Sequence, residues 1–521
     1  MSRGPTLPAV GGYDALCAGF DWALPARLNM ARQACFDWLD QPNRLAIIDL
    51  SQGERRDVSY GDLAWRVRAL AGYLADRGVT RGDRVGVLRA QDPWTAAAHL
   101  AIWTLGAISL PLFKLFGPDA LHSRLGDSGV THVITDGEGA ALLSALAVTA
   151  HIPELVSLHD TDLEPVDTGP EDPAVLIYTS GTTGAPKGAL HGHRVLSGHL
   201  PGVEISHDRL GQPGDVLWTP ADWAWIGGLF DVLMPGLALG VPVVAARLPK
   251  FTAQAAREVI REGGVRNVFF PPTALKLLRS ADMALPGLRS VASGGEPLGA
   301  EMLDWGQRAF GLQINEFYGQ TEGNMIASSA GSLFPPRPGC IGKPVPGHAL
   351  AVLGRDGPLG DGVEGDIAVK RGSASMFLGY WNRPEATAEK FRGDWMLTGD
   401  RGLWEQGYLR FVGREDDVIT SAGYRIGPAE IEDCLLRHPA VAMAAVIGVP
   451  DPERTERIRA HVVLNEGAEV TEVELQTHIR TRLSAHLVPR EVRFVNELPM
   501  TLTGKIIRRN LKLQAEREIR E

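Results

Sequence analysis

The chain has 521 residues, of which 44% are hydrophobic and 22% are charged. That length exceeds the roughly 250–300 residues at which a single hydrophobic core stops growing, so we expect at least two domains. The formal charge of -10 argues against a protein whose main task is to grip nucleic-acid phosphates, because such binding depends on lysine and arginine. The four cysteines form no C-x-x-C pair, which favours a reducing, cytoplasmic location over a disulfide framework or a zinc ribbon.

Neither a targeting signal nor a membrane span is expected. Residues 1–12 lack the apolar run and the small-residue cleavage site of a secretory signal. The most apolar stretch covers residues 95–113, but His99, Gly106 and Pro111 interrupt it. We therefore predict a buried helix followed by a strand in this stretch.

From Gly78 onward, short apolar segments alternate with segments of helix length, which is typical of βαβ units and a parallel sheet. The first run of expected elements covers residues 84–88, 94–105, 107–112, 119–128 and 131–135. A second run covers residues 216–247, 253–262, 268–270, 272–280 and 290–292. These two runs predict two α/β layers within one large N-terminal lobe.

The composition changes after Gly339, where glycine and proline become frequent. Segments 349–353 and 366–371 alternate with turns there, which indicates antiparallel sheet or a small barrel that still belongs to the large lobe.

A compact pattern of helices and strands begins beyond Gly413 and predicts a separate small domain. Its expected elements cover residues 428–437, 441–449, 459–464 and 473–483. We thus predict an α/β protein with a large N-terminal lobe at residues 1–414, made of two α/β layers plus a small barrel-like sheet. A small, mobile α+β domain at residues 415–521 completes it.

The strongest chemical signal follows the apolar strand expected at residues 174–177. Its polar and glycine residues are Thr179, Ser180, Gly181, Thr182, Thr183, Gly184 and Lys187. The glycines let backbone N–H groups approach an anion, the hydroxyls donate further hydrogen bonds, and the lysine adds a positive charge. A polar surface turn is the alternative, but this density of donors predicts a polyphosphate site.

This loop is not a Walker A motif, because Lys187 stands between Pro186 and Gly188 and not in a G-K-[ST] sequence. One G-x-G-x-x-G pattern begins at Gly360, but it joins two strand-like segments and opens no helix. We interpret it as a hairpin turn and disfavour both a P-loop NTPase and a dinucleotide-binding protein.

The loop resembles the phosphate-binding signature of the adenylate-forming (AMP-binding) superfamily. Further segments similar to the family's motifs follow in the family's order: Gly294-Gly295-Glu296-Pro297, Tyr318-Gly319-Gln320-Thr321-Glu322, Thr398-Gly399-Asp400, Gly413-Arg414-Glu415-Asp416-Asp417 and Thr503-Gly504-Lys505. The similarity covers nearly the whole chain and is greatest to the medium-chain acyl-CoA synthetases.

The resemblance implies an ATP-dependent acyl-CoA synthetase. A carboxylic acid and ATP would give acyl-AMP and pyrophosphate, and acyl-AMP and CoA would then give acyl-CoA and AMP. By resemblance the ATP site would also include Gly295, Glu296, Pro297, Glu316, Phe317, Tyr318, Gly319, Gln320, Thr321, Asp400, Arg414, Arg425 and Lys505.

Particular roles follow from the same resemblance. Glu322 and Thr179 would hold Mg²⁺, which prefers oxygen ligands, and Asp400 would accept hydrogen bonds from the ribose hydroxyls. Lys505 would be the catalytic lysine, placed between the carboxylate and the α-phosphate where negative charge accumulates. Without the resemblance, each of these residues would be read as a turn, cap or surface residue.

Asp416 stands where the family has the hinge between its domains, which implies that one site serves both half-reactions. After the small domain turns, Ala422, Gly423 and Tyr424 would line the approach of the CoA arm. Ala422 departs from the commoner pattern, in which serine often stands.

The residues expected to border the acyl group are Trp223, Trp225, Ile226, Gly227 and Gly319. Acetate-using relatives carry tryptophan where this chain has Gly319, so the space is expected to be open. Each further buried CH₂ can contribute about 0.8 kcal/mol, which favours short-to-medium chain or small aromatic acids over acetate.

Other readings stay open. A free-standing enzyme that loads a carrier protein would share the ATP motifs, and so would a protein that binds nucleotide without catalysis. His191 and His193 could suggest a metal site, but no third ligand of suitable spacing lies near them.

Overall fold

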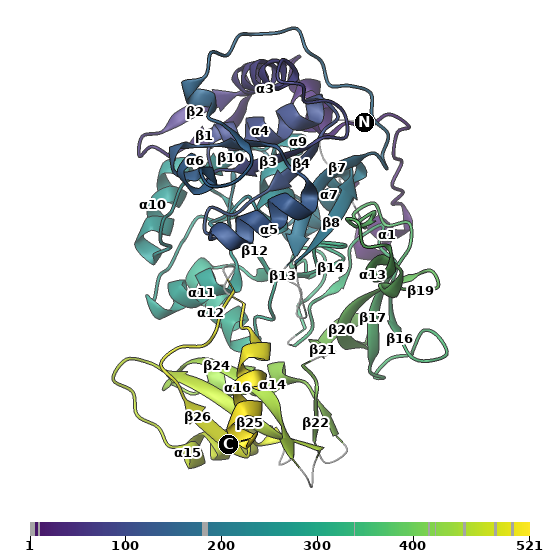
Figure 1. Ribbon diagram of the computed structural model, residues 1–521. Coiled ribbons are helices and arrows are strands. Elements are labelled where there is room, and N and C mark those ends of the chain that lie inside the picture. The colour runs from purple at the N-terminus through teal and green to yellow at the C-terminus, as the bar shows by residue number, and fades with distance from the viewer. Residues whose placement is uncertain are drawn as a thin grey trace.

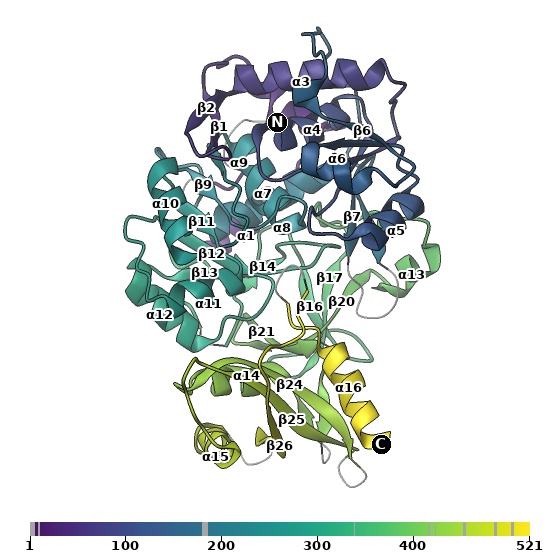
Figure 2. The ribbon, with the colours of Figure 1, turned by 60° about the vertical axis from the view of Figure 1, so that its left-hand side comes forward.

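The computed structural model describes residues 6–8, 11–179, 186–337, 339–414, 417–421, 424–451, 455–483, 487–501 and 505–520 (Figure 1). A large lobe contains the N-terminal part of the chain, and a smaller domain with the C-terminal helix lies at one end of it (Figures 1 and 2). This arrangement confirms the predicted fold class.

A seven-stranded sheet forms one layer of the large lobe, in the order β18-β8-β7-β4-β3-β5-β6. The strands from β7 to β6 in this order run parallel, whereas β8 pairs antiparallel with β7 on one side and with β18 on the other. The strands are β3 (Arg84–Leu88), β4 (Ile108–Pro111), β5 (His132–Thr135), β6 (Thr149–His151), β7 (Pro173–Thr179), β8 (Lys187–Gly192) and β18 (Gly379–Tyr380). The intervening helices are α4 (Pro93–Thr104), α5 (Pro118–Ser128) and α6 (Gly137–Leu143).

A nine-stranded sheet forms the second layer, in the order β15-β14-β13-β12-β11-β9-β10-β1-β2. Its strands are β1 (Leu45–Asp49), β2 (Arg56–Ser59), β9 (Leu217–Trp218), β10 (Val243–Ala245), β11 (Asn267–Phe269), β12 (Ser290–Gly294), β13 (Ile314–Tyr318), β14 (Ala327–Ser328) and β15 (Lys343–Pro344). The associated helices are α1 (Tyr13–Ala18), α2 (Met30–Ala34), α3 (Tyr60–Ala75), α7 (Arg194–Ser206), α8 (Ile226–Gly228), α9 (Met234–Leu239), α10 (Ala253–Gly263), α11 (Pro272–Ser280) and α12 (Ala300–Phe310). Both predicted α/β layers are therefore present.

A third, antiparallel sheet lies between these layers and the small domain (Figure 2). It contains β16 (Leu350–Leu353), β17 (Gly365–Lys370), β19 (Phe391–Arg392), β20 (Trp395–Glu405) and β21 (Tyr408–Arg414), and helix α13 (Pro384–Glu389) precedes β19. The predicted hairpin turn at Gly360 is confirmed, because β16 and β17 pair antiparallel on either side of it.

The small domain has its own sheet and hydrophobic core. Its elements are β22 (Ile419–Ser421), β23 (Tyr424–Ile426), α14 (Pro428–Leu436), β24 (Val441–Asp451), β25 (Thr455–Leu464), α15 (Glu472–Arg482), β26 (Glu491–Phe494) and α16 (Arg508–Arg520). The boundary between residues 414 and 415 stays a prediction.

The apolar stretch that includes α4 is a core helix, as the sequence predicts. Asp92 accepts a hydrogen bond from the Thr95 N–H, and Pro93 occupies the first turn, so the start of the helix is well determined. Nearly every residue of α4 is buried in the core. No helix among the described residues has both the length and the apolar character that crossing a bilayer requires.

Candidate active site

The predicted phosphate-binding residues follow β7 and precede β8, two antiparallel strands whose ends pair at Thr179 and Lys187. The Thr179 hydroxyl donates to the Lys187 carbonyl at 3.3 Å, and the Lys187 ammonium lies 5.3 Å from the ring centre of Tyr380 on β18. Residues 180–184, predicted for the same site, lie outside the described residues. The two described strand ends thus bring the Thr179 hydroxyl and the Lys187 backbone together on either side of the connecting residues.

Glu322 is nearly buried beside this hairpin. The Tyr380 hydroxyl donates to its carboxylate, and the backbone N–H of Phe377 donates to its carbonyl at 2.8 Å. Tyr380 thus contacts both the predicted metal ligand Glu322 and the predicted phosphate-binding residue Lys187. A buried carboxylate next to a phosphate site has the donor chemistry that Mg²⁺ prefers.

Asp400 forms a second polar centre with Tyr318 and Arg414. The Tyr318 hydroxyl donates to Asp400 Oδ2 at 2.5 Å, and Arg414 Nε lies 3.6 Å from Oδ1. Burial raises the pKa of Asp400, while the positive charge of Arg414 acts in the opposite direction. Because the two residues are direct partners on β20 and β21, the sheet itself sets their separation.

Lys390 belongs to this site, although sequence reasoning did not identify it. Its ammonium donates to Gln320 Oε1 at 3.0 Å and to the carbonyls of Leu397 and Thr398 at 3.0 and 3.3 Å. Burial lowers its pKa, and the carboxylates of Glu322 and Asp400 oppose that shift. Lys390 therefore ties the motif at Gln320 to the motif at Asp400.

The predicted adenine slot lies where β12 and β13 end side by side. Gly294 packs under the ring of Phe317, and the Leu298 N–H donates to Glu316 Oε1 at 3.4 Å. Burial raises the pKa of Glu316 to about 8. The adjoining Pro297 is exposed, and Glu296 lies 3.7 Å from Lys276.

Lys505 reaches the large lobe from the small domain. Its Cε lies 3.7 Å from the position that a Cβ would take at Gly295, and the Trp225 ring lies equally close to that position. Lys505 is exposed to solvent, yet the surrounding protein lowers its pKa by desolvation, and the Glu296 carboxylate opposes that shift. Lys505 and Trp225 thus converge on the end of β12.

The residues expected around the acyl group separate into two kinds. Trp225 contacts Phe269, with ring centres 5.7 Å apart, and borders the Lys505 site, whereas Trp223 is fully buried in the main core. Ile226 and Gly227 form the short helix α8, and Gly227 packs under the Trp225 ring.

The expectation of open space beside Gly319 is wrong. A Cβ at Gly319 would overlap the backbone nitrogen of Met325, because the chain folds back tightly after β13. The glycine is needed for this close approach of two backbone segments, which sequence spacing cannot reveal. Gly319 therefore gives no measure of acyl-chain length.

The remaining sequence expectations concern a metal site at His191 and His193, and a hinge and a CoA site in the small domain. His191 and His193 are buried, and His193 Nδ1 accepts a hydrogen bond from the Met30 N–H at 3.1 Å. Among the described residues no group of three or more histidine, cysteine or acidic side chains could hold a metal ion. The predicted hinge residue Asp416 and the CoA-site residues Ala422 and Gly423 lie outside the described residues.

The backbone of β23 carries the remaining predicted residues, Tyr424 and Arg425. They pair with Ser421 and Thr420 of β22.

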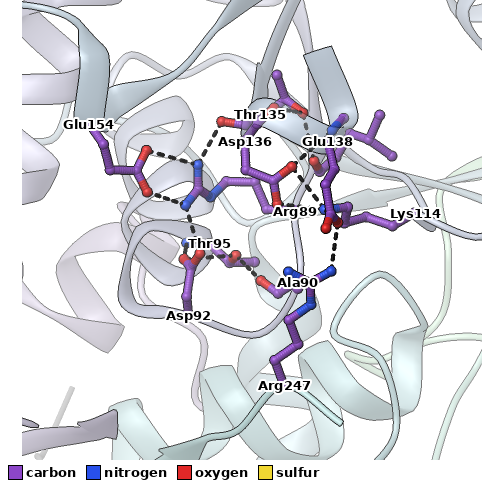
Figure 3. A network of polar contacts seen from close by, with 12 residues as sticks. Arg89, Ala90, Asp92, Thr95, Lys114, Thr135, Asp136, Glu138, Glu154 and Arg247 are labelled. Atoms are coloured by element: carbon purple, nitrogen blue, oxygen red, sulfur yellow. Dashed lines mark hydrogen bonds and ion pairs between the residues drawn. The ribbon is translucent and has the colours of Figure 1, made fainter. Parts of the chain in front are cut away.

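A charged network at the carboxyl ends of β3, β4 and β5 joins the two large-lobe layers (Figure 3). Glu138 accepts from Lys114 at 2.6 Å and from Arg247, which follows β10 of the other sheet, at 2.5 Å. Arg89 is buried and donates to Glu154 and Asp92, each at 2.6 Å. Gln91, two residues after Arg89, donates to the Ala221 carbonyl, so this end of the sheet contacts the loop that leads to Trp225.

Comparison with known proteins gives the family. A family model described as "AMP-binding enzyme" matches residues 36–381, and one described as "AMP-binding enzyme C-terminal domain" matches residues 430–505. Acetyl-coenzyme A synthetase of Bacillus subtilis (strain 168) is 32% identical, covering 97% of this chain and 96% of the relative. Mitochondrial acyl-coenzyme A synthetase ACSM2 of Rattus norvegicus is 34% identical, covering 94% and 92%.

Among solved structures, ATP-bound MatB from Rhodopseudomonas palustris matches with a TM-score of 0.83 and 28% identity, covering 93% of this chain and 98% of MatB. The apo structure of the same protein matches with a lower TM-score, 0.75. The chain therefore belongs to the AMP-binding enzyme family and, within it, to the acyl-CoA synthetases, which are AMP-forming acid-thiol ligases.

Proposed function

We propose that this acyl-CoA synthetase activates short-to-medium chain or small aromatic carboxylic acids, with the roles that the sequence motifs imply. The observation that carries the proposal is the approach of Lys505 to Gly295 and Trp225, beside the Asp400 and Glu322 carboxylates. The Lys505 ammonium, which belongs to the small domain, would then lie between the nucleotide site and the aromatic ring of Trp225. That is the arrangement in which a carboxylate could be joined to a nucleotide phosphate.

In the first half-reaction a carboxylate oxygen attacks the α-phosphorus of ATP, and pyrophosphate leaves. Two anions must meet for this bond to form, so the Lys505 ammonium stabilises the charge that develops between them. Asp400 accepts hydrogen bonds from the ribose, and Arg414 and Lys390 balance the carboxylates around it.

Glu322 and Thr179 have suitable oxygen atoms to hold Mg²⁺ beside the Lys187 end of the phosphate hairpin. The ion would supply positive charge to the polyphosphate. Tyr380 fixes the Glu322 carboxylate, and Lys187 contributes a second positive charge from the protein itself.

In the second half-reaction the CoA thiol attacks the acyl carbonyl, and AMP leaves as acyl-CoA forms. We propose that Asp416 is the hinge and that residues 422–424 line the thiol's approach. A carrier-protein acceptor is the less favoured alternative, since the relatives described above are named as CoA synthetases.

The aromatic boundary formed by Trp225, Phe269 and Phe317 supports acids with an apolar chain or ring. We also propose a cytoplasmic location, because all four cysteines are free thiols.

The test is release of pyrophosphate and AMP from Mg-ATP with acids from acetate to decanoate and benzoate, with and without CoA. Turnover that requires both an acid and CoA, with a maximum between butyrate and octanoate or on benzoate, supports the proposal. A maximum on acetate would contradict the substrate class, and turnover independent of CoA would contradict thioester formation. Lys505→Gln is the control and should reduce adenylation by about 10²–10³-fold.

A further inference from the structure

Helix α14 of the small domain faces the large lobe (Figure 2) and carries two adjacent acidic residues with different partners. Glu432 turns toward the start of α16 in its own domain, where it meets Arg508. Asp433 pairs through Oδ2 with Arg437 of the same helix at 2.7 Å, and its Oδ1 lies against Gly299 of the large lobe. One helix therefore connects the large lobe to the segment that carries Lys505.

The contact with the large lobe is close. Gly299 precedes α12, has a φ of +75°, and has its Cα so near Asp433 that a Cβ there would overlap Asp433 Oδ1. A side chain at Gly299 would displace the Asp433 carboxylate from this position. The first N–H groups of α12 also favour a carboxylate at this end of the helix, where Gly299 itself offers no side-chain cap.

The contact within the small domain is a nearly buried ion pair. Arg508 Nη2 lies 2.7 Å from Glu432 Oε2 and Arg508 Nε lies 3.3 Å from Oε1, while Arg508 Nη1 lies 3.8 Å from Asp417 beside the predicted hinge. Glu432 also accepts the Val446 N–H at 2.7 Å, so strand β24 holds the carboxylate in place. A bidentate arginine pair fixes direction as well as distance.

Arg508 stands three residues after Lys505, and this short segment is itself constrained. The Lys505 N–H donates to Thr501 Oγ1 at 2.9 Å, and Lys505 accepts from the Thr501 N–H at 2.7 Å. The Ile507 N–H donates to the Pro499 carbonyl at 2.8 Å. Lys505 is therefore held to Thr501 by its backbone, and Ile507 is held to Pro499, immediately before Arg508.

We propose that Asp433, Glu432 and Arg508 are positioning residues for Lys505 in the adenylation step. Asp433 fixes the position of α14 against Gly299 of the large lobe. The Glu432–Arg508 pair then fixes the position of the Lys505 segment relative to α14. This inference rests on the proposed function and adds to it a set of residues that touch neither ATP nor the acid. It requires that the contact between Asp433 and Gly299 be present during adenylation and absent during thioester formation, because the small domain turns away from the large lobe for the second half-reaction.

The experiment compares the two half-reactions in Arg508→Gln, Glu432→Gln and Asp433→Ala. Adenylation is followed by acid-dependent exchange of pyrophosphate into ATP, and thioester formation by consumption of supplied acyl-AMP with CoA. We expect kcat for adenylation to fall by about 10–100-fold, since a displacement of about 1 Å can cost 10²-fold, with thioester formation unchanged within about threefold.

Matched controls are Arg517→Gln, an exposed arginine on α16, and Glu430→Gln, an exposed acid on α14. Both should retain the two half-reactions. Arg508→Lys should recover part of the adenylation rate, because it keeps a charge opposite Glu432 but loses the bidentate geometry.

Labelling of Lys505 by an amine-acylating reagent, measured by mass spectrometry with ATP present, gives a readout independent of turnover. We expect more labelling of Lys505 in Asp433→Ala than in the wild type. If Arg508→Gln does not fold, Asp433→Ala carries the test, because that side chain is partly exposed.

Equal losses in both half-reactions, or unchanged adenylation and labelling, would overturn the positioning role. A wild-type protein that performs neither half-reaction would instead reject the proposed function.

Discussion

Replacing Arg89 with methionine would measure how much the network in Figure 3 contributes to stability. The guanidinium is 1% exposed and donates to Asp92 at 2.6 Å, to Glu154 at 2.6 Å and to the Thr135 carbonyl at 2.6 Å. Methionine would leave these acceptors without their donor while filling most of the volume. The variant therefore isolates the polar contribution.

Removing one partner of a buried ion pair typically costs about 3–5 kcal/mol. Because Arg89 has two carboxylate partners and one carbonyl partner, we expect about 4–5 kcal/mol. At about 2–4 °C per kcal/mol for larger domains, the melting temperature should fall by about 8–20 °C.

The loss should also depend on pH. Burial raises the pKa of Asp92, and Arg89 acts against that rise. Without Arg89 the pKa of Asp92 should rise further, so its carboxylate destabilises the fold above that pKa and is relieved by protonation as the pH falls. The difference in melting temperature between wild type and variant should therefore shrink as the pH falls from 8 toward 5.

Differential scanning calorimetry across that pH range is the assay, with Arg27→Gln as the control. Arg27 pairs with Asp167 at 2.7 Å, but its side chain is 79% exposed, so its loss should cost less than about 1 kcal/mol. A loss in Arg89→Met no larger than in the control, or one that does not change with pH, would refute the reasoning.

Three further predictions use other parts of the large lobe. Asp400→Asn removes the charge opposite Arg414 and should raise the KM for ATP by about 10–100-fold, since hydrogen bonds to charged groups contribute about 1.5–3 kcal/mol; an unchanged KM would contradict the assigned ribose contact. Burial raises the pKa of Glu204 from 4.5 to about 7, so the folded state binds an extra proton between these values, and wild-type stability should fall as the pH rises through that window. Glu204→Gln should abolish that slope in melting temperature, and a retained slope would point to another group. Gly319→Ala should destabilise the protein by about 1–3 kcal/mol, because the added Cβ overlaps the Met325 backbone; a variant as stable as wild type in urea would contradict this packing.

Much of the fold follows from periodicity in the sequence. The predicted strand at 84–88 is β3 and the predicted helix at 272–280 is α11, because each has a regular apolar pattern bounded by turn residues. The π-helical turn at Leu229–Leu233 was missed, since its residues are all buried and show no polar face to mark a period.

The sequence predicts the motif residues of the candidate site but not the residues that hold those motifs in position. Asp400 and Glu322 stand in recognisable segments, whereas Lys390 and Tyr380 look in sequence like surface and edge residues. Their contacts depend on β18 joining β8 and on the turn from Lys390 meeting Gln320, which are tertiary pairings. Gly319 shows the reverse error, because a family comparison suggested space where the backbone itself stands.

The two sheets of the large lobe are interleaved along the chain, and this limits how the protein can be shortened or made in pieces. β1 near residue 47 pairs with β10 near residue 243, while β18 at residue 380 covers the edge of β8. A nascent chain must therefore keep β1 without its parallel partner until some two hundred more residues have left the ribosome, a long-range pairing of the kind that slows folding. Any fragment that ends before residue 380 would expose the β8 edge, and exposed strand edges promote aggregation.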